Sequence, residues 1–156
     1  MDTLTKARSC RHTQIRLTTN RATEFIDLTD RLGQFIAEAE VRVGLLNIQT
    51  LHTTTAIVVN EHEPLLLADF RAFLERTAPR STAYAHDDMF RRTGASAGEP
   101  PNGHAHCRAL VLPTSVCLNV VDGRLALGRW QRVFLVELDG PRTRDVSVVA
   151  VRESAL

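Results

Sequence analysis

The sequence predicts an α+β fold with a mixed or antiparallel, sandwich-like β-sheet and two main amphipathic helices. Apolar stripes of helical period occur in 27–39 and 64–77, and each follows a segment of strand character. An Asp-Gly pair at 122–123 separates two alternating runs, the strongest short-range signal of a β-hairpin. With 156 residues, 44% hydrophobic and 24% charged, the chain has the size and composition of one globular domain, so we expect a single domain over 1–156.

The first part of the chain alternates between strands and helices. Polar and apolar residues alternate over 11–19, which predicts a half-buried strand. Asp27 is the expected N-cap of the first helix. The expected apolar stripe of this helix consists of Leu28, Leu32, Phe35, Ile36 and Ala39. The β-branched run over 41–59 is longer than a typical strand, so we expect a break or bulge at 52–55.

A second helix is expected from Pro64, which has the φ favoured at the first helical position, to about Thr77. Its expected apolar face consists of Leu66, Phe70, Phe73 and Leu74. The segment 79–103 is rich in Gly, Pro, Ser, Asn and Asp and has no apolar period, which predicts a long loop. Loops of this length in a compact domain often cover a functional site.

The remainder of the chain is predicted to be β after a short helical stretch at 104–112. Strands are expected at 114–121, 124–138 and 144–151, with turns at 122–123 and 139–141. Trp130 has apolar neighbours and is expected in the core. Gln131 would need a hydrogen-bond partner if it points inward, and it would then form the polar wall of a site.

The charge composition argues against several classes of partner. Nineteen Lys and Arg against 18 Asp and Glu give a net charge of +1, so we expect neither nucleic acid nor a membrane as partner. Residues 1–17 lack the apolar region of a secretory signal, and no stretch approaches the ~20 apolar residues of a membrane span. Three cysteines without a C-x-x-C pair make a disulfide framework unexpected and favour the cytoplasm.

Polar side chains that a scaffold does not need concentrate in three segments, which are 52–61, 86–88 and 102–106. Five of the six histidines lie in or beside them. Neutral imidazole is a common zinc ligand, and a catalytic site needs about three protein ligands, which His52, His86 and His106 could supply. Spacing alone leaves open that these are ordinary surface histidines.

Other candidates also have two explanations. His104 and His106 share a side only in a strand, so at most one of them is expected to be a ligand, and His62 is expected to face solvent. Glu61 lies just before a helix, where an acidic residue interacts favourably with the helix dipole whether or not it has a function. Arg144 and its neighbour Arg142 could bind an anion or lie at the edge of a sheet.

Taken together, the motifs resemble the YjbQ-like family, some members of which are named secondary thiamine-phosphate synthase. The resemblance covers about residues 12–152 and rests on six motifs in order. They are H-T-T-T-A-I-V-V-N-E at 52–61, P-L-L-L-A-D-F at 64–70, Y-A-H-D-D at 84–88, N-G-H-A-H at 102–106, G-R-L-A-L-G-R-W-Q at 123–131 and E-L-D-G-P-R-T-R at 137–144.

The resemblance implies a compact α+β fold, commonly assembled as a homotrimer, and a metal bound near the H-T-T segment. The implied ligands are His52, His86 and His106, and the implied pocket residues are Thr54, Asn60, Glu61, Gln131 and Arg144. Thr55 and Arg129 depart from the family pattern, as does Cys107 in place of an apolar residue. The loop between His86 and His106 is also longer, so we expect substrate access or subunit contacts to differ.

Three functions are compatible with these residues. The thiamine-phosphate synthase implied by the family name would use Mg²⁺ to assist the departure of pyrophosphate from a phosphorylated substrate. A metal-dependent hydrolase of a small phosphorylated substrate would use a divalent ion such as zinc, with Glu61 or Asp87 as the proton acceptor. A protein without enzymatic activity would use the histidines to bind a metal or anion, or to hold a trimer together.

Overall fold

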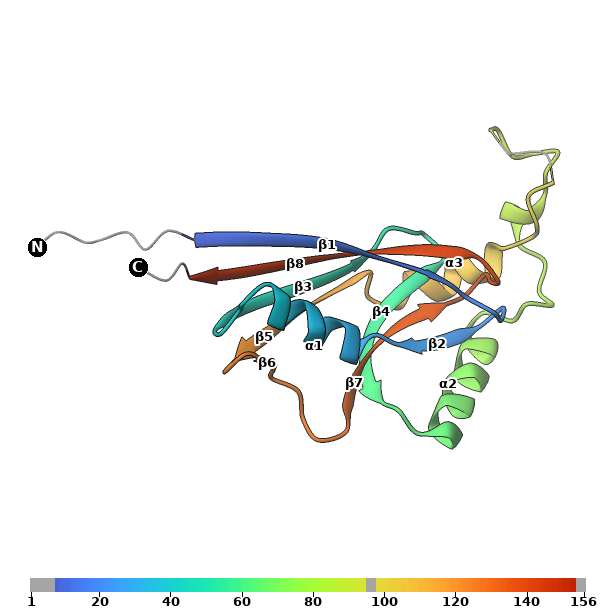
Figure 1. The fold of residues 1–156 in the computed structure, drawn as a ribbon. Coiled ribbons are helices and arrows are strands. Elements are labelled where there is room, and N and C mark those ends of the chain that lie inside the picture. The colour runs from blue at the N-terminus through green and yellow to red at the C-terminus, as the bar shows by residue number, and fades with distance from the viewer. Residues whose placement is uncertain (1–7, 95–97, 154–156) are drawn as a thin grey trace, which may run out of the picture.

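A computed structural model gives the fold and describes residues 8–94 and 98–153. In these ranges the chain forms eight strands, three α-helices and one 3₁₀ helix (Figure 1). The strands are β1 (Arg8–Thr18), β2 (Glu24–Asp27), β3 (Gly44–Thr50), β4 (Thr55–Glu61), β5 (Ser115–Val121), β6 (Arg124–Leu125), β7 (Gln131–Glu137) and β8 (Thr143–Glu153). The helices are α1 (Thr29–Glu38), α2 (Pro64–Thr77), α3 (Gly103–Leu110) and the 3₁₀ helix η1 (Ala85–Asp87).

The strands form two sheets, and every pairing is antiparallel. The larger sheet has the order β1-β8-β3-β5-β6, and the smaller has the order β2-β7-β4. Asp122 and Gly123 join β5 to β6 with positive φ values of 50° and 75°, as a type I′ hairpin turn requires. The predicted α+β class and the predicted hairpin are therefore confirmed.

Three of the connections that carry the chain between the two sheets meet at one corner of the molecule. They are residues 19–23, 51–54 and 138–142. Backbone hydrogen bonds tie them together, from Thr19 N to Arg142 O (2.9 Å), from Leu51 N to Asp145 O (3.2 Å) and from Leu138 N to Thr54 O (3.2 Å). The break expected at 52–55 is one of these connections, and polar residues from distant parts of the sequence meet there.

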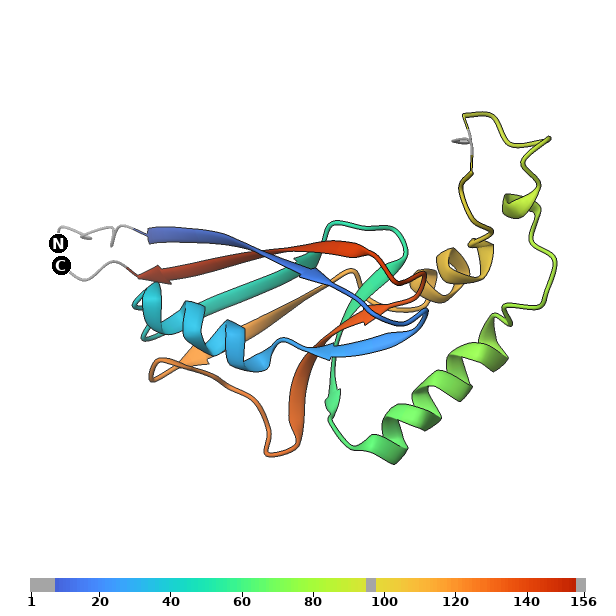
Figure 2. The ribbon, with the colours of Figure 1, turned by 45° about the vertical axis from the view of Figure 1, so that its right-hand side comes forward.

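Two apolar clusters hold the sheets and helices together. The first lies between α1 and both sheets, with Leu32 and Ile36 of the helix among its fully buried members. The second lies on the other face of the small sheet, where Phe134 packs with Leu67 and Leu74 of α2 and with residues of α3. Figure 2 shows α1 across the large sheet and α2 beside the small one. The small sheet is thus covered on both faces.

The start of α1 differs from the prediction. Asp27 is the last residue of β2, a four-residue strand that the sequence analysis did not predict, and the helix begins at Thr29. The Asp27 carboxylate accepts a hydrogen bond from Thr29 N at 2.8 Å and contacts Arg132 Nε at 2.6 Å. The expected N-cap is wrong because the strand pairing of Asp27 with β7 places its carboxylate before the helix.

Two aromatic residues expected in the core lie at the surface. Phe73 of α2 is 55% exposed, and Leu67 is buried instead. Trp130 is 60% exposed, with the Arg129 guanidinium 4.5 Å from its ring. The expected strand over 124–138 is interrupted at 126–130, where the chain passes from the large sheet to the small one, so Trp130 has no sheet neighbours to cover it.

Two further observations concern membrane-spanning helices and the state of the cysteines. None of the helices in the described ranges combines the length and apolar character needed to cross a bilayer. The three cysteines, Cys10, Cys107 and Cys117, are free thiols and exposed.

Gly44 provides a test of the sheet packing. A Cβ at this position would lie 2.2 Å from the carbonyl oxygen of Val151 in the neighbouring strand, so the backbone of β8 would have to move. We expect Gly44→Ala to lower the free energy of unfolding by about 1–3 kcal/mol, measured by urea denaturation. The matched control is Gly33→Ala in α1, where a Cβ would contact nothing within 4 Å. It should raise stability by about 0.5–1 kcal/mol, and similar effects in both variants would contradict the packing described.

Candidate functional site

A buried ion pair lies at the corner where the inter-sheet connections meet. Glu137, the last residue of β7, is 0% exposed, and Arg144 near the start of β8 is 4% exposed. Arg144 Nε donates to Glu137 Oε2 at 2.7 Å, and Arg144 Nη2 donates to Glu137 Oε1 at 2.6 Å. Two parallel charge-assisted hydrogen bonds of this kind fix the plane of the guanidinium.

Additional hydrogen bonds satisfy this pair. The Thr19 hydroxyl donates to Glu137 Oε2 at 3.0 Å, and the backbone N–H groups of Leu138 and Asp139 donate to Oε1 at 3.0 and 2.8 Å. Arg144 Nη2 also donates to Thr54 Oγ1 at 3.0 Å. A buried ion pair is tolerated when its remaining hydrogen-bonding capacity is used in this way.

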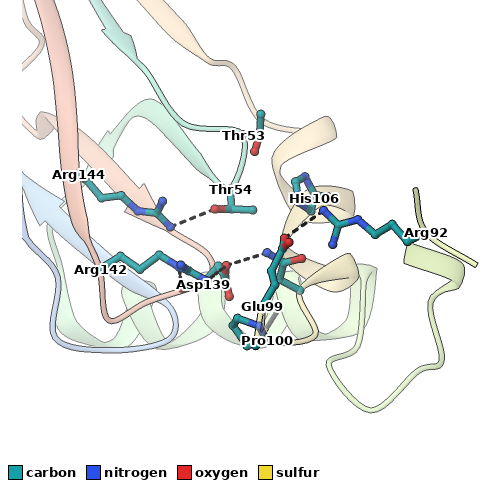
Figure 3. A pocket seen from close by; sticks show the side chains of 11 residues that line it. Thr53, Thr54, Arg92, Glu99, Pro100, His106, Asp139, Arg142 and Arg144 are labelled. Carbon is teal, nitrogen blue, oxygen red and sulfur yellow. Dashed lines mark hydrogen bonds and ion pairs between the residues drawn. The ribbon is translucent and has the colours of Figure 1, made fainter. Parts of the chain in front are cut away.

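A polar cavity of about 580 Å³ opens beside this pair (Figure 3). Its lining residues are Thr53, Thr54, Arg92, Gly98, Glu99, Pro100, Asn102, His106, Asp139, Arg142 and Arg144. Arg144, Arg142 and Asp139 come from the β7–β8 corner, and His106 faces them from α3. Part of the predicted long loop supplies another wall, as expected of a loop that covers a site.

Each of the three cavity arginines has a carboxylate partner. Arg92 contacts Glu99 at 3.0 Å and Arg142 contacts Asp139 at 2.8 Å. The Asn102 side chain also donates to Asp139, at 3.0 Å. These contacts hold the guanidinium groups in defined directions around a common space.

His86 and His106 lie next to each other at one side of the cavity. Their ring centroids are 4.6 Å apart, and the rings are inclined by 65°. Burial lowers the pKa of the His106 imidazole, and the neighbouring His86 lowers it further, so His106 is neutral at pH 7. His86 Nε2 is buried and has no hydrogen-bond partner among the residues that the structure describes.

Asp87 holds the segment of His86 against the start of α3. Its Oδ1 accepts hydrogen bonds from the backbone N–H groups of Asn102 (2.9 Å) and Gly103 (2.8 Å). A Cβ on Gly103 would lie 2.5 Å from the Cβ of Tyr84, so only glycine permits this approach. The relative position of the two histidines therefore depends on a cap supplied from another segment of the chain.

His52 lies in the β3–β4 connection, and one of its ring nitrogens is already engaged. Its Nε2 accepts a hydrogen bond from the backbone N–H of Asp145 at 2.8 Å. A neutral imidazole that accepts a hydrogen bond at Nε2 carries its proton on Nδ1. In this arrangement neither ring nitrogen of His52 has a lone pair available for a metal ion. Burial, and next the charge of Arg144, lower the pKa of His52 and favour this neutral form.

The predicted site residues fall into two groups. In the first, Thr54, Arg144 and His106 line the cavity, the His86 ring lies beside that of His106, Asp87 follows His86 in the chain, and His52 shares the β3–β4 connection with Thr54. The second group, Asn60, Glu61 and Gln131, lies at the other end of β4 and β7, where Glu61 pairs with Gln131. In the described part of the chain, no group of three or more His, Cys, Asp or Glu side chains is arranged to hold a metal.

The members of the second group have separate surroundings. Asn60 borders an apolar cavity with Phe70 and Phe73. Glu61 lines a separate cavity with Trp130. Gln131 Oε1 accepts a hydrogen bond from Gly128 N at 2.8 Å and so closes the loop before β7.

Several cavity residues were missed in the sequence analysis. Glu137, which lies beside the cavity and holds Arg144, was also missed, although a carboxylate in the apolar run Phe-Leu-Val-Glu-Leu is a signal, because a buried charge requires a partner. Arg92 and Glu99 belong to the irregular loop, where no periodicity indicates which side chains point inward. Asp139 belongs to a predicted turn and carried no separate signal.

The buried pair generates a stability prediction. Glu137→Ala would leave the Arg144 charge buried without its partner, and we expect a loss of about 3–5 kcal/mol in the free energy of unfolding. The control is Arg16→Ala, which removes the ion pair between Arg16 Nε and Asp145 Oδ1 (2.8 Å). The Arg16 side chain is 71% exposed. Urea denaturation should show no measurable change for the control. Similar losses in the two variants would mean that burial does not determine the strength of the pair.

Three histidines that are partly or fully buried predict a dependence of stability on pH. Burial lowers the pKa of His52, His104 and His106 in the folded protein. Their contribution is therefore complete above the unfolded-state pKa of about 6.5 and is lost as the pH falls through the folded pKa values. We expect the free energy of unfolding to decrease as the pH falls below about 6.5, and the decrease to be smaller in His104→Gln. Urea denaturation across this range tests it, and an increase on acidification would contradict it.

Comparison with known proteins places the chain among its relatives. A family model described as UPF0047 protein YjbQ-like matches residues 13–153. A UPF0047 protein of Archaeoglobus fulgidus is 41% identical over 138 residues, which cover 88% of this chain and 99% of that protein. A UPF0047 protein of Methanothermobacter thermautotrophicus is 36% identical over 135 residues, which cover 86% of this chain and 87% of the relative.

Solved structures show the same fold. The crystal structure of a protein of unknown function from Sulfolobus solfataricus, described as YbjQ-like, superposes with a TM-score of 0.84 at 32% identity and covers 94% of this chain and 100% of that one. A hypothetical protein from Aeropyrum pernix gives a TM-score of 0.80 at 31% identity, covering 92% of this chain and 99% of that one. Sequence and fold agree over nearly the whole chain, which therefore belongs to the YjbQ-like family of UPF0047 proteins.

Proposed function

We propose that the protein binds a small phosphorylated molecule in the arginine-lined cavity and hydrolyses it with the help of a divalent metal, preferably zinc. The observation that supports this most is the convergence of Arg92, Arg142 and Arg144 with His106 on one cavity of about 580 Å³. That size suits a small metabolite. Planar guanidinium groups match the geometry of phosphate oxygens, and three of them around one space favour a multiply charged anion.

The arginines are oriented before the ligand arrives. Glu137 fixes Arg144 through two hydrogen bonds, and Asp139 fixes Arg142 through the 2.8 Å contact. Side chains that are already ordered lose little conformational entropy on binding. Phosphate oxygens would share these guanidinium groups with the carboxylates, since an arginine has five N–H donors.

His86 and His106 fit two positions of a zinc site. Their rings are adjacent, His106 is neutral, and the buried His86 Nε2 is without a hydrogen-bond partner within the described residues. A zinc ion supplies Lewis acidity and activates water near neutral pH. His52, the third ligand implied by the resemblance, would have to release Asp145 N to contribute.

Asp87 is the better placed of the two proposed proton acceptors in a single chain. It is adjacent to His86, and its Oδ1 is used to cap α3 while the carboxylate retains a second oxygen. Glu61 lies at the other end of β4 and would reach this cavity only from a neighbouring subunit. We further propose that the protein is a homotrimer that acts in the cytoplasm.

Hydrolysis is favoured over the synthase activity that the family resemblance implied. Transfer with departure of pyrophosphate normally uses Mg²⁺ held by carboxylates. The two carboxylates that line the cavity, Glu99 and Asp139, are both paired with arginine. Imidazole is instead a ligand for zinc and similar metals, which matches the side chains beside the cavity.

The test combines metal analysis with turnover. We expect the wild type to contain about one zinc per chain. Hydrolysis of p-nitrophenyl phosphate should fall roughly 100-fold or more in His106→Ala, because loss of a residue that only hydrogen-bonds a metal ligand already costs about 10- to 100-fold in metal affinity or activity. His12→Ala is the matched control, because this exposed histidine of β1 contacts only Ser147 at 3.1 Å among the interactions described. It should retain both zinc and turnover.

Two outcomes would contradict hydrolysis. Equal turnover in the wild type and His106→Ala would show that the histidine pair is not involved, and the absence of stoichiometric metal would remove the activating ion. Bound metal with no turnover, together with a lower thermal stability or a smaller mass by light scattering in His106→Ala, would indicate the non-enzymatic role instead.

A further inference from the structure

A second cavity lies next to the first and shares a wall with it. Its volume is about 350 Å³, and its lining includes Arg80, Pro100, His104, Asp139, Pro141 and Arg142. Pro100, Asp139 and Arg142 also line the first cavity. The Arg142 guanidinium is thus at the boundary, where it can contact ligand groups on both sides.

His104 is the most buried residue of this second cavity. It is 3% exposed, and its Nε2 is buried without a hydrogen-bond partner among the residues that the structure describes. Buried polar atoms in folded proteins are nearly always hydrogen-bonded, and an exception calls for an explanation. A ligand oxygen that accepts from Nε2–H would provide one.

The charges around His104 favour an anionic ligand. Arg80 and Arg142 line the cavity together with His104, and Asp139, the carboxylate in the same lining, is paired with Arg142 at 2.8 Å. Arg108 is occupied by Glu75 and by the Ala78 carbonyl oxygen, at 3.0 Å from the latter. Arg80, by contrast, is exposed and lines the same cavity as His104.

We propose that the second cavity is a subsite for a second anionic group, a phosphate or a carboxylate, held by Arg80, His104 and Arg142. The ligand of the protein would then be a small molecule with two anionic groups, one in each cavity. This inference rests on the proposed binding of a phosphate in the first cavity. It adds the class of ligand, and it gives a function to His104, which the proposed hydrolysis does not use.

The test compares probes that carry one or two anionic groups. We would measure by calorimetry the binding of inorganic phosphate, pyrophosphate and phosphonoacetate to the full-length protein as purified. The wild type should bind the better of the two double anions roughly 10- to 100-fold more tightly than phosphate, the range expected for a charge-assisted hydrogen bond. A preference for pyrophosphate assigns a phosphate to the second subsite, and a preference for phosphonoacetate assigns a carboxylate.

Variants separate the two cavities. Arg80→Ala should remove most of the gain for the double anion and change phosphate binding by less than about two-fold. His104→Gln should also reduce the gain, and its thermal unfolding shows whether it remains folded. Arg76→Ala is the matched control, because it removes the same charge from an exposed position four residues away, outside both cavities.

The outcomes distinguish this inference from the proposed function. Binding of phosphate with no tighter binding of either double anion would overturn the second subsite and leave the first intact. Equal effects of Arg80→Ala and Arg76→Ala would also overturn it, because only general charge would then matter. Failure of the wild type to bind any of the three probes would remove the anion site of the first cavity, and with it the proposed function.

Discussion

The ion pair between Glu137 and Arg144 is the constraint on which the rest of the structure depends. A carboxylate with no exposure is stable only if donors surround it, and here the donors come from two of the connections between the sheets and from Arg144 of β8. Satisfying one buried charge therefore fixes where the strands must turn. The same requirement directs Arg144 toward Thr54 and the cavity. The corner that closes the fold and the candidate site are built by the same interactions.

Much of the fold could be predicted because the spacing of apolar residues indicates whether a segment is a helix or a strand and which of its faces is buried. The break at 52–55, the α1 stripe and the Asp-Gly hairpin are local patterns, and all three are present. Trp130 was expected in the core because its neighbours are apolar, and Phe73 because it falls on the apolar face of α2, but exposure depends on which sheet or helix faces a residue. The strand β2 has only four residues, too few to show an alternation against its surroundings.

The candidate site could be predicted only in part, for a related reason. His86 and His106 were two of the three candidate metal ligands, and the structure places their rings 4.6 Å apart. Glu61 is separated from Thr54 by the length of β4, so residues close in sequence lie at opposite ends of a strand. Glu137 could have been noticed as a charge in an apolar run, whereas its partner could be identified only after the strand pairing was known.

The loop between η1 and α3 has a consequence for how such proteins diversify. It contributes Arg92, Glu99 and Pro100 to the cavity, yet none of these residues belongs to either sheet or to the two apolar clusters. Doubling the length of a flexible loop costs only about 0.6 kcal/mol, so such a segment can be lengthened or replaced at little expense to folding. Selection can therefore reshape the mouth of the cavity, and with it the choice of metabolite, while the sheets and their buried ion pair stay the same.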